Sequence, residues 1–196
     1  DTLHKALKDA GLTEGEVLKR ATLDHIKSEL ERQYFGQGRY DASIVVTNDA
    51  KPRNRVAVDI KINEGDSAKI QAINIVGNNA FSDDELIKIF QLKKTHLTSF
   101  FKSDDKYARE KLTGDLEALR SYYLDRGYIN FSLNSNQVTL SADKKKVYID
   151  INITEGEKYT FGETKILGEL PVDEKELQKL VIIKSGKTYS QQYVTA

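Results

Sequence analysis

Residues 146–154 read KVYIDINIT, and apolar and polar side chains alternate along the whole stretch. Successive side chains of a strand point to opposite faces, so the apolar residues at positions 147, 149, 151 and 153 share one face. A strand with one apolar and one polar face belongs to a sheet that helices cover on one side only. Residues 55–63 (RVAVDIKIN) repeat the pattern. The two stretches therefore predict an α+β unit that occurs at least twice.

Other blocks recur around these two strands in the same order. They are YFGQGRY at 34–40 with YYLDRGY at 122–128, INEG at 62–65 with ITEG at 153–156, IVG at 75–77 with ILG at 166–168, and EL-x-x-IF at 85–90 with EL-x-x-LV at 176–181. The terminal tyrosines of the first pair are 88 residues apart, and the members of the other pairs are 91 apart. Self-similarity at a nearly fixed period is the signature of a repeat architecture. The sequence thus predicts a tandem array.

Residues 66–156 contain one complete repeat. A strand at 69–76 precedes a short helix, and Ser82 with Glu85 three residues later forms a capping-box pattern at its start. A longer helix at 106–126 ends before Gly127, and strands at 129–140 and 146–154 complete the unit. The predicted fold class is α+β: tandem βααββ modules, each a three-stranded mixed sheet covered on one face by two helices.

The two flanking repeats are incomplete. Residues 1–65 form a partial module that lacks its first strand, and the full module occupies residues 66–156. Residues 157–196 supply only a first strand and a first helix, and stop where a second helix would begin near Gln191. The chain also contains no methionine, so we expect it to be an excerpt or a processed product.

The order of strands in the module follows from its connections. The last two strands are joined by a tight turn and pair antiparallel, whereas the first strand suits a parallel neighbour. The last strand is therefore predicted at the centre, with the first and the middle strands at the two edges. The middle strand changes phase, because Phe131 and Leu133 are odd-numbered whereas Val138 and Leu140 are even-numbered. This change predicts a β-bulge between positions 134 and 137.

The middle strand is the candidate functional element. Residues 134–137 (NSNQ) are polar, uncharged and free of proline. Proteins blunt exposed edges with charge, proline or a bulge, and here only the bulge is predicted. An open edge of this kind binds an extended polypeptide by adding it as a further strand. The alternative is a solvated edge that has no partner.

Composition argues against several classes of function. The 196 residues include no cysteine, and none of the three histidines has a second histidine at metal-ligand spacing. Thirty basic and thirty acidic residues are interspersed, unlike the basic stripe of a nucleic-acid-binding protein. No apolar run approaches the roughly 20 residues that cross a bilayer. We expect no enzymatic activity, no cofactor, no metal and no nucleic-acid partner.

Four motifs of the complete repeat carry a family resemblance: INIVGN at 73–78, Phe81 followed by DEL at 84–86, LRSYYLDRGY at 119–128 and ITEG at 153–156. In this order they resemble the POTRA (polypeptide-transport-associated) domain family, and most closely its arrays in outer-membrane protein assembly factors. PRNRV at 52–56 and the Arg-Gly-Tyr step look like the second and third repeats of a five-repeat array. The resemblance covers most of the second repeat, all of the third and the first part of the fourth.

The resemblance implies a periplasmic array ahead of a membrane β-barrel, at the outer membrane of a Gram-negative bacterium. Such an array receives unfolded outer-membrane β-barrel proteins from periplasmic chaperones and docks accessory assembly lipoproteins. It would touch the membrane only through the rest of the parent chain. The alternative is a POTRA spacer of a related secretion transporter or cell-division protein, with a structural role.

The resemblance also implies site residues. The family's strand-addition edge corresponds to Asn130, Phe131, Ser132, Leu133, Asn134, Ser135, Asn136 and Gln137. The partner-docking candidates are Leu92, Lys93, Phe100 and Phe101, although this chain has phenylalanines where the family commonly has a tryptophan pair. Independently of the family, the next strand follows soon after Glu64-Gly65 and after Glu155-Gly156, so these four residues are predicted to be hinges with restricted motion.

Overall fold

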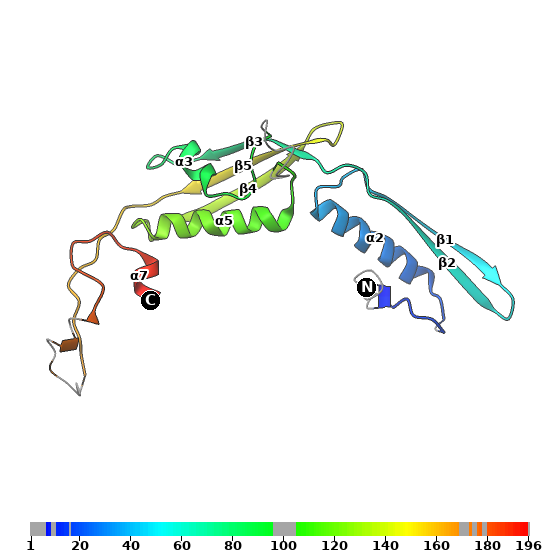
Figure 1. Cartoon of the computed structure of the whole chain (residues 1–196), viewed down its shortest axis with the longest axis horizontal. Coiled ribbons are helices and arrows are strands. Elements are labelled where there is room, and N and C mark those ends of the chain that lie inside the picture. The colour runs from blue at the N-terminus through cyan, green and yellow to red at the C-terminus, as the bar shows by residue number, and fades with distance from the viewer. Residues whose placement is uncertain are drawn as a thin grey trace.

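The central strand of the molecule is β5 (Lys146–Thr154), which lies between the other two strands of its sheet. In the computed structural model, which describes residues 7–8, 11–15, 17–95, 105–168, 173, 176–177 and 180–195, β3 (Lys69–Val76) pairs with β5 in parallel. β4 (Ser132–Leu140) pairs with it antiparallel, giving the order β3-β5-β4. The predicted order and directions are confirmed. Two helices, α3 (Asp83–Lys88) and α5 (Arg109–Leu124), accompany this sheet (Figure 1).

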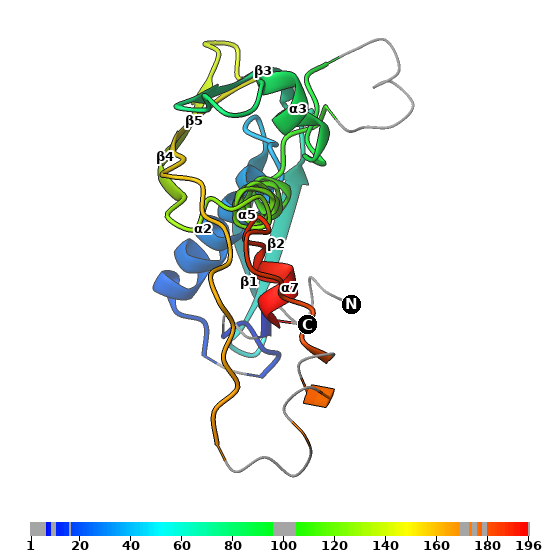
Figure 2. The same cartoon turned by 90° about the vertical axis from the view of Figure 1, so that its left-hand side faces the viewer.

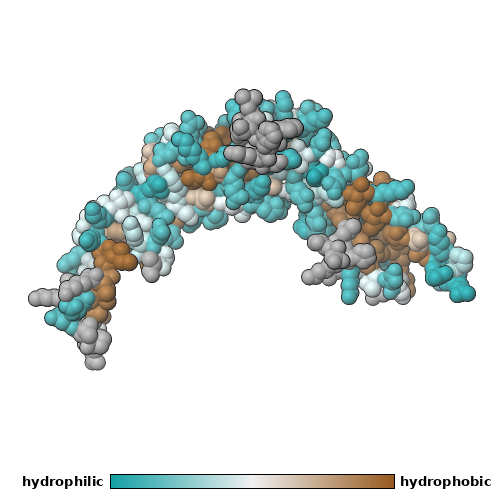
Figure 3. Space-filling model, viewed as in Figure 1, coloured by the Kyte–Doolittle hydropathy of each residue, from teal (hydrophilic) through white to brown (hydrophobic). Residues whose placement is uncertain are grey.

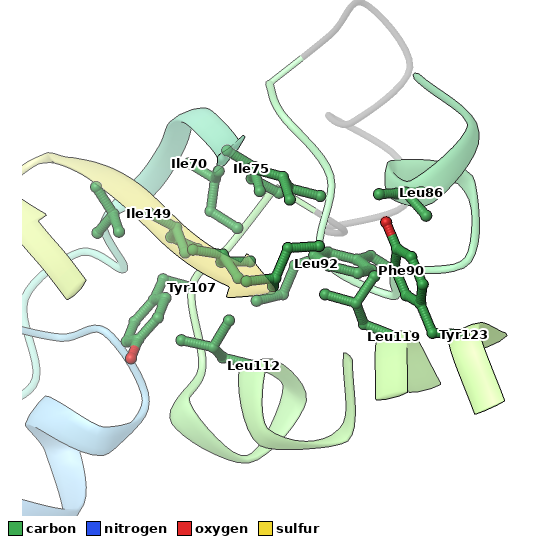
Figure 4. Packing of buried hydrophobic residues seen from close by; sticks show 14 of the residues in the cluster. Ile70, Ile75, Leu86, Phe90, Leu92, Tyr107, Leu112, Leu119, Tyr123 and Ile149 are labelled. Carbon is green, nitrogen blue, oxygen red and sulfur yellow. The ribbon is translucent and has the colours of Figure 1, made fainter. Parts of the chain in front are cut away.

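The core of the central unit (residues 66–156) lies between the sheet and the helices (Figure 4). All four apolar residues of the alternating stretch are at most 3% exposed, as the period-two pattern predicts. The fully buried members of the core are Ile70, Leu86, Leu92, Leu119, Tyr123, Val147 and Ile149. Figure 2 looks along α5 and shows this helix on one side of the sheet.

Both helices of the central unit begin and end close to the predicted residues. The backbone N–H of Glu85 donates to the hydroxyl of Ser82 at 3.3 Å, which confirms the cap. The reciprocal half of a capping box does not form in α3, because the Glu85 carboxylate accepts the hydroxyl of Tyr122 instead. The helix α5 starts later than the predicted 106–126, since residues 105–107 pair with the start of β3, and it ends two residues earlier, at Leu124.

The N-terminal part of the chain contains α2 (Arg20–Gly36) and a hairpin of β1 (Ser43–Lys51) and β2 (Arg55–Asn63). A separate small core joins them through Ile26, Leu30 and Ile44. Figure 3 shows a hydrophobic patch at this end of the molecule. Val45 of β1 and Val56 of β2 are 50% and 47% exposed, so this core is incomplete within the described residues.

Among the described residues after 156, the predicted first strand is reduced to an isolated bridge between Thr160 and Thr188. The helix α7 (Gln191–Thr195) begins at the predicted residue. The parts follow one another along an arch (Figure 1). In the described ranges, no helix is both long enough and apolar enough for a membrane span. The same ranges contain no group of three or more potential metal ligands.

The junctions between successive parts repeat one hydrogen bond. The N–H of Ala68, before β3, donates to the carbonyl of Gly38 at 2.8 Å. At the next junction, the N–H of Tyr159 donates to the carbonyl of Gly127, also at 2.8 Å. Each part is therefore attached to the end of the helix before it as well as through the chain.

The hydrogen bonds at the helix ends correct the alignment of residues 34–40 with residues 122–128. Arg39 N–H donates to the carbonyl of Tyr34 at 2.9 Å, and Tyr128 N–H donates to that of Tyr123 at 3.1 Å. The hydroxyls of Tyr34 and Tyr123 donate to Glu64 and Glu155, the glutamates of the two matched strand ends. Arg39 is thus the equivalent of Tyr128. Pairing Tyr40 with Tyr128 was wrong by one residue, because adjacent aromatic residues in both copies allow a shifted match.

Candidate functional site

The candidate edge is narrower at its start than the sequence predicts. β4 begins at Ser132, while Asn130 lies in a turn and Phe131 is 5% exposed. The Phe131 ring stacks on Tyr123 with centroids 4.5 Å apart, so this residue belongs to the core. Asn130 and Phe131 are therefore removed from the candidate edge. At its other end the strand continues through Val138, Thr139 and Leu140, three residues beyond the predicted segment.

The predicted β-bulge is present in β4. The register with β5 shifts between Leu133 and Ser135, which leaves Asn134 as the extra residue. The side chain of Asn134 donates to Thr154 at 2.9 Å and accepts the hydroxyl of Ser132 at 3.0 Å. These bonds hold the bulge in place on the polar face of the sheet. The bulge explains why Leu133 and Val138 both face the core despite their opposite parity.

The backbone of β4 past the bulge faces two directions in alternation. Ser141 N–H donates to the carbonyl of Lys146 at 3.0 Å and closes the hairpin, so this pair is hydrogen-bonded. In an antiparallel ladder, hydrogen-bonded and non-hydrogen-bonded pairs alternate. The alternation turns the N–H and C=O of Leu140, Val138 and Asn136 away from β5. No described residue outside the ladder bonds to these groups.

The opposite edge of the sheet is less available. At the start of β3, Ile70 N–H donates to the carbonyl of Asp105 at 2.8 Å, and the carbonyl of Ile70 accepts Thr95 N–H at 2.9 Å. Neighbouring segments of the chain thus already use that part of the β3 edge. Asn136–Leu140, which we call the open edge, is the candidate site. Of the predicted site residues, only Asn136 and Gln137 belong to the open edge. Val138, Thr139 and Leu140 were missed as site residues, although the even-numbered apolar pair Val138 and Leu140 showed that the strand continues past the bulge.

The two faces of the sheet differ along the open edge. Val138 and Leu140 are half-buried and pack against the core, as does Leu133 before the bulge. Gln137 and Thr139, on the other face, are exposed. β4 contains no charged residue, and neither proline nor charge protects its edge.

Of the predicted docking residues, the structure describes Leu92 and Lys93, which follow α3. Leu92 is fully buried, and its N–H donates to Asp115 at 3.0 Å, so its docking assignment is withdrawn. The ammonium group of Lys93 donates to the carbonyls of Ile87 and Lys88 at the end of α3, at 2.6 and 3.1 Å. Phe100 and Phe101 fall outside the described residues. Asp115, which no sequence pattern indicated, fixes this segment by accepting two backbone N–H groups.

The residues predicted to be hinges are held by the preceding part of the chain. The guanidinium of Arg39 contacts the Glu64 carboxylate at 3.3 Å and donates to the carbonyl of Gly65 at 2.7 Å. At the second junction, the Glu155 carboxylate accepts Ala80 N–H at 3.0 Å and the hydroxyl of Tyr123 at 2.8 Å. The hinge role of Glu64, Gly65, Glu155 and Gly156 remains a prediction. A change of angle at the first junction would have to occur after Gly65.

The model of the POTRA family, described as a surface antigen variable number repeat, matches residues 1–65 and 68–156. The chain belongs to the POTRA family. Both matched segments end at the glycine of a Glu-Gly step, Gly65 or Gly156, two residues after β2 or β5 ends. The family match accords with the α+β fold, in which a small mixed sheet is accompanied by two helices.

Relatives of this POTRA chain are outer membrane protein assembly factors named BamA. The one from Neisseria meningitidis is 32% identical over 197 residues, covering the whole chain and 25% of that protein. The one from Buchnera aphidicola is 30% identical, covering 94% of the chain and 30% of that protein. The chain thus spans about a quarter to a third of these relatives. A crystal structure of Haemophilus influenzae BamA POTRA3-5 shares the fold, with 18% identity and a TM-score of 0.51 over 97% of this chain and 76% of that one.

Proposed function

We propose that this chain is a periplasmic scaffold segment of the machinery that assembles outer-membrane β-barrel proteins. It would bind unfolded barrel proteins at the open edge of β4, and would receive them from periplasmic chaperones alongside accessory lipoproteins. The supporting observations are the family, the names of its relatives and the unpaired backbone of Asn136, Val138 and Leu140. We further propose that residues 1–65, 66–156 and 157–196 are separate POTRA modules, of which only the second is complete.

Main-chain pairing suits a site that accepts many different clients. An added strand bonds through main-chain N–H and C=O groups, so the pairing itself requires no particular client sequence. The outward groups of the open edge lie at every second residue, which is the spacing of a strand ladder. A client that is still unfolded offers extended backbone that pairs with them.

Proline at Asn136 is expected to weaken peptide binding by at least 10-fold, because it removes an outward N–H. Folding should change by less than about 1 kcal/mol, since proline is tolerated on an edge strand where the N–H faces solvent. The measurement is a titration with an extended peptide from a β-barrel protein, followed through backbone amide shifts of the protein.

Gln137→Pro is the matched control, because this N–H is directed into the ladder with Asp150. It should lower the free energy of unfolding by about 2 kcal/mol through the lost bond. Equal stability of the two variants would show that the assigned directions of the backbone are wrong. Peptide-induced shifts on β1 rather than β4 would argue against the proposed site.

A second candidate function is that of a spacer, and the junctions favour it. The Tyr40 ring stacks on Tyr107 of the next part, with centroids 6.4 Å apart, and burial raises the pKa of Tyr40 to about 12. Two successive parts are therefore joined by packed aromatic side chains as well as by the chain. In this role the array would set the distance and angle between other domains, in a secretion transporter or a cell-division protein as well as in barrel assembly.

Gly38→Ala is expected to change the angle between the first two parts. Gly38 has φ +75°, and an added Cβ would lie 2.6 Å from the carbonyl oxygen of Tyr107 across the junction. The contact must open, and small-angle X-ray scattering of the whole chain should report a change in its overall dimensions. Gly36→Ala is the control, because its Cβ would meet only a side-chain oxygen of Glu110 at 3.9 Å. Identical scattering from both variants would contradict a packed junction.

A further inference from the structure

We infer that the open edge selects an extended segment in which apolar and polar residues alternate and which carries acidic residues at one end. This inference rests on the proposed function, because it describes the ligand of the same edge. The proposed occupant is an amphipathic strand from another polypeptide. Three features of the described residues support this choice: the helix side of the edge, its polar side and the turn at its end.

On the helix side, the edge leaves apolar surface partly uncovered. Val138 and Leu140 are half-buried although they pack against the core, and Leu116 of α5 is half-buried as well. Residues paired across two strands point to the same face, with their Cβ atoms close enough to touch. Side chains of an added strand opposite positions 138 and 140 would therefore complete this burial if they were apolar.

On the other side, the edge is lined by polar, uncharged side chains. Gln137 and Thr139 are exposed, and the neighbouring Tyr148 and Asp150 of β5 continue the polar surface. The Asp150 carboxylate accepts the side-chain amide of Asn74 at 2.7 Å, so it is already engaged. An apolar side chain of the added strand would find no apolar surface to cover on this face, whereas a polar side chain there would stay hydrated. The two faces together select alternation with a period of two.

The turn that follows β4 is basic. Residues 141–146 contain three lysines and one acid, Asp143. The Asp143 carboxylate accepts the hydroxyl of Ser141 at 2.5 Å and the N–H of Lys145 at 3.1 Å, which fixes it within the turn. Lys145 and Lys146 are exposed, and neither forms an ion pair with any described residue. An acidic group at the adjoining end of an added strand would meet this positive charge.

A second copy of the chain is the main rival occupant. Two β4 edges could pair with each other, since each offers the same unpaired groups. The charges argue against this pairing for antiparallel strands centred on the open edge, because each basic turn would then lie beside residues 132–135 of the other copy, which include no acid. Dilution of the labelled protein alone separates the two cases: amide shifts on β4 that depend on protein concentration would overturn the inference.

The test uses four peptides of equal length and the whole chain. The first peptide alternates three valines with three threonines and carries two glutamates at its N-terminus. The second has the same alternating residues and carries the two glutamates at its C-terminus. The third has the sequence of the first, with two lysines in place of the two glutamates. The fourth has the composition of the first, with its valines grouped in one block. A peptide merely shifted in phase is no control, because slippage by one residue restores its pairing.

The alternating peptide with glutamates at one end is expected to bind about 5- to 10-fold more tightly than the blocked peptide, as the sum of a few cross-strand contacts. It should bind about 2- to 5-fold more tightly than the lysine peptide, and this second difference should vanish at high salt. The end at which glutamate helps reports the direction of the added strand. Equal affinities of all four peptides would overturn the inference while leaving general strand addition intact.

Lys145→Glu supplies a test on the protein itself. It brings the formal charge of residues 141–146 from +2 to 0, and should therefore abolish the preference between glutamate and lysine peptides without affecting the preference for alternation. Lys61→Glu, an exposed lysine on β2, makes the same change of net charge and should leave both preferences unchanged. If Lys61→Glu abolishes the charge preference equally, the preference comes from net charge and the basic turn has no role. Absence of any β4 shift with every peptide would contradict the proposed function itself.

Discussion

Replacing Gly77 with alanine is expected to lower the free energy of unfolding of the central unit by about 3 kcal/mol or more. Gly77 has φ +99° at the end of β3, a conformation that costs a residue with a side chain about 1 kcal/mol or more. An added Cβ would also overlap the backbone carbonyl oxygen of Ile153, on the central strand. Backbone atoms in a sheet move little, so the strain cannot be relieved locally. Urea unfolding, followed by circular dichroism, measures the loss.

Gly114→Ala is the matched control and should have the opposite sign. Gly114 lies inside α5, and its Cβ would meet only the side-chain nitrogen of Gln91 at 3.9 Å. Alanine in an exposed helix interior is favoured over glycine by about 0.5–1 kcal/mol. The same substitution in the same unit thus destabilises at one position and stabilises at the other. A loss of less than about 1 kcal/mol for Gly77→Ala would contradict the close approach of Gly77 to β5.

Replacing Asp115 with alanine is expected to destabilise the unit by about 2–4 kcal/mol. Its carboxylate, only 1% exposed, accepts the N–H groups of Gln91 and Leu92 at 2.6 and 3.0 Å. Alanine would leave both N–H groups without their acceptor, and each buried unpaired group costs about 1–3 kcal/mol. Asp115→Asn should recover about half of the loss, since one amide oxygen remains. Amide exchange of Leu92 should accelerate in the alanine variant.

The same carboxyl gives a pH dependence with a definite sign. Burial raises the pKa of Asp115 above its ordinary value, although the two N–H donors oppose the shift. The folded state therefore holds this proton more tightly than the unfolded state, and stability falls as the pH rises through the folded pKa. The advantage of the wild type over Asp115→Asn should be larger at pH 3 than at pH 6. An advantage that grows with pH would show that the hydrogen bonds outweigh burial.

The sequence predicted the bulge in β4 better than it predicted the partner-docking residues. The apolar residues change from odd to even numbers between Leu133 and Val138, and this change predicted the bulge. Residues that face the core alternate with a period of two, so such a change requires one extra residue in the strand. Leu92 shows the opposite case. Its short segment between helices has no periodicity, so only the contact with Asp115 revealed that it is buried. The start of β4 was also misplaced, because stacking on Tyr123 turns Phe131 into the core ahead of the strand.

The repeat pattern likewise determined the units more clearly than the joints between them. Alternation of side chains fixed which face of β5 is buried, and the turn and crossover lengths fixed the order β3-β5-β4. At the junctions, Gly38 and Gly127 each accept a bond from the following strand segment. Neither contact has a sequence signal, since glycine is usual after a helix for its backbone conformation alone.

By itself the sequence determined the family, the α+β module and the polar, uncharged strand, because these depend on local periodicity and on residue types at fixed spacing. Tertiary structure alone decided which backbone groups of β4 remain unpaired, that Asp115 holds the Gln91–Leu92 segment, and how the parts are joined. These features depend on groups distant in the chain that meet only after folding. A hydrogen bond between such groups leaves no period in the sequence.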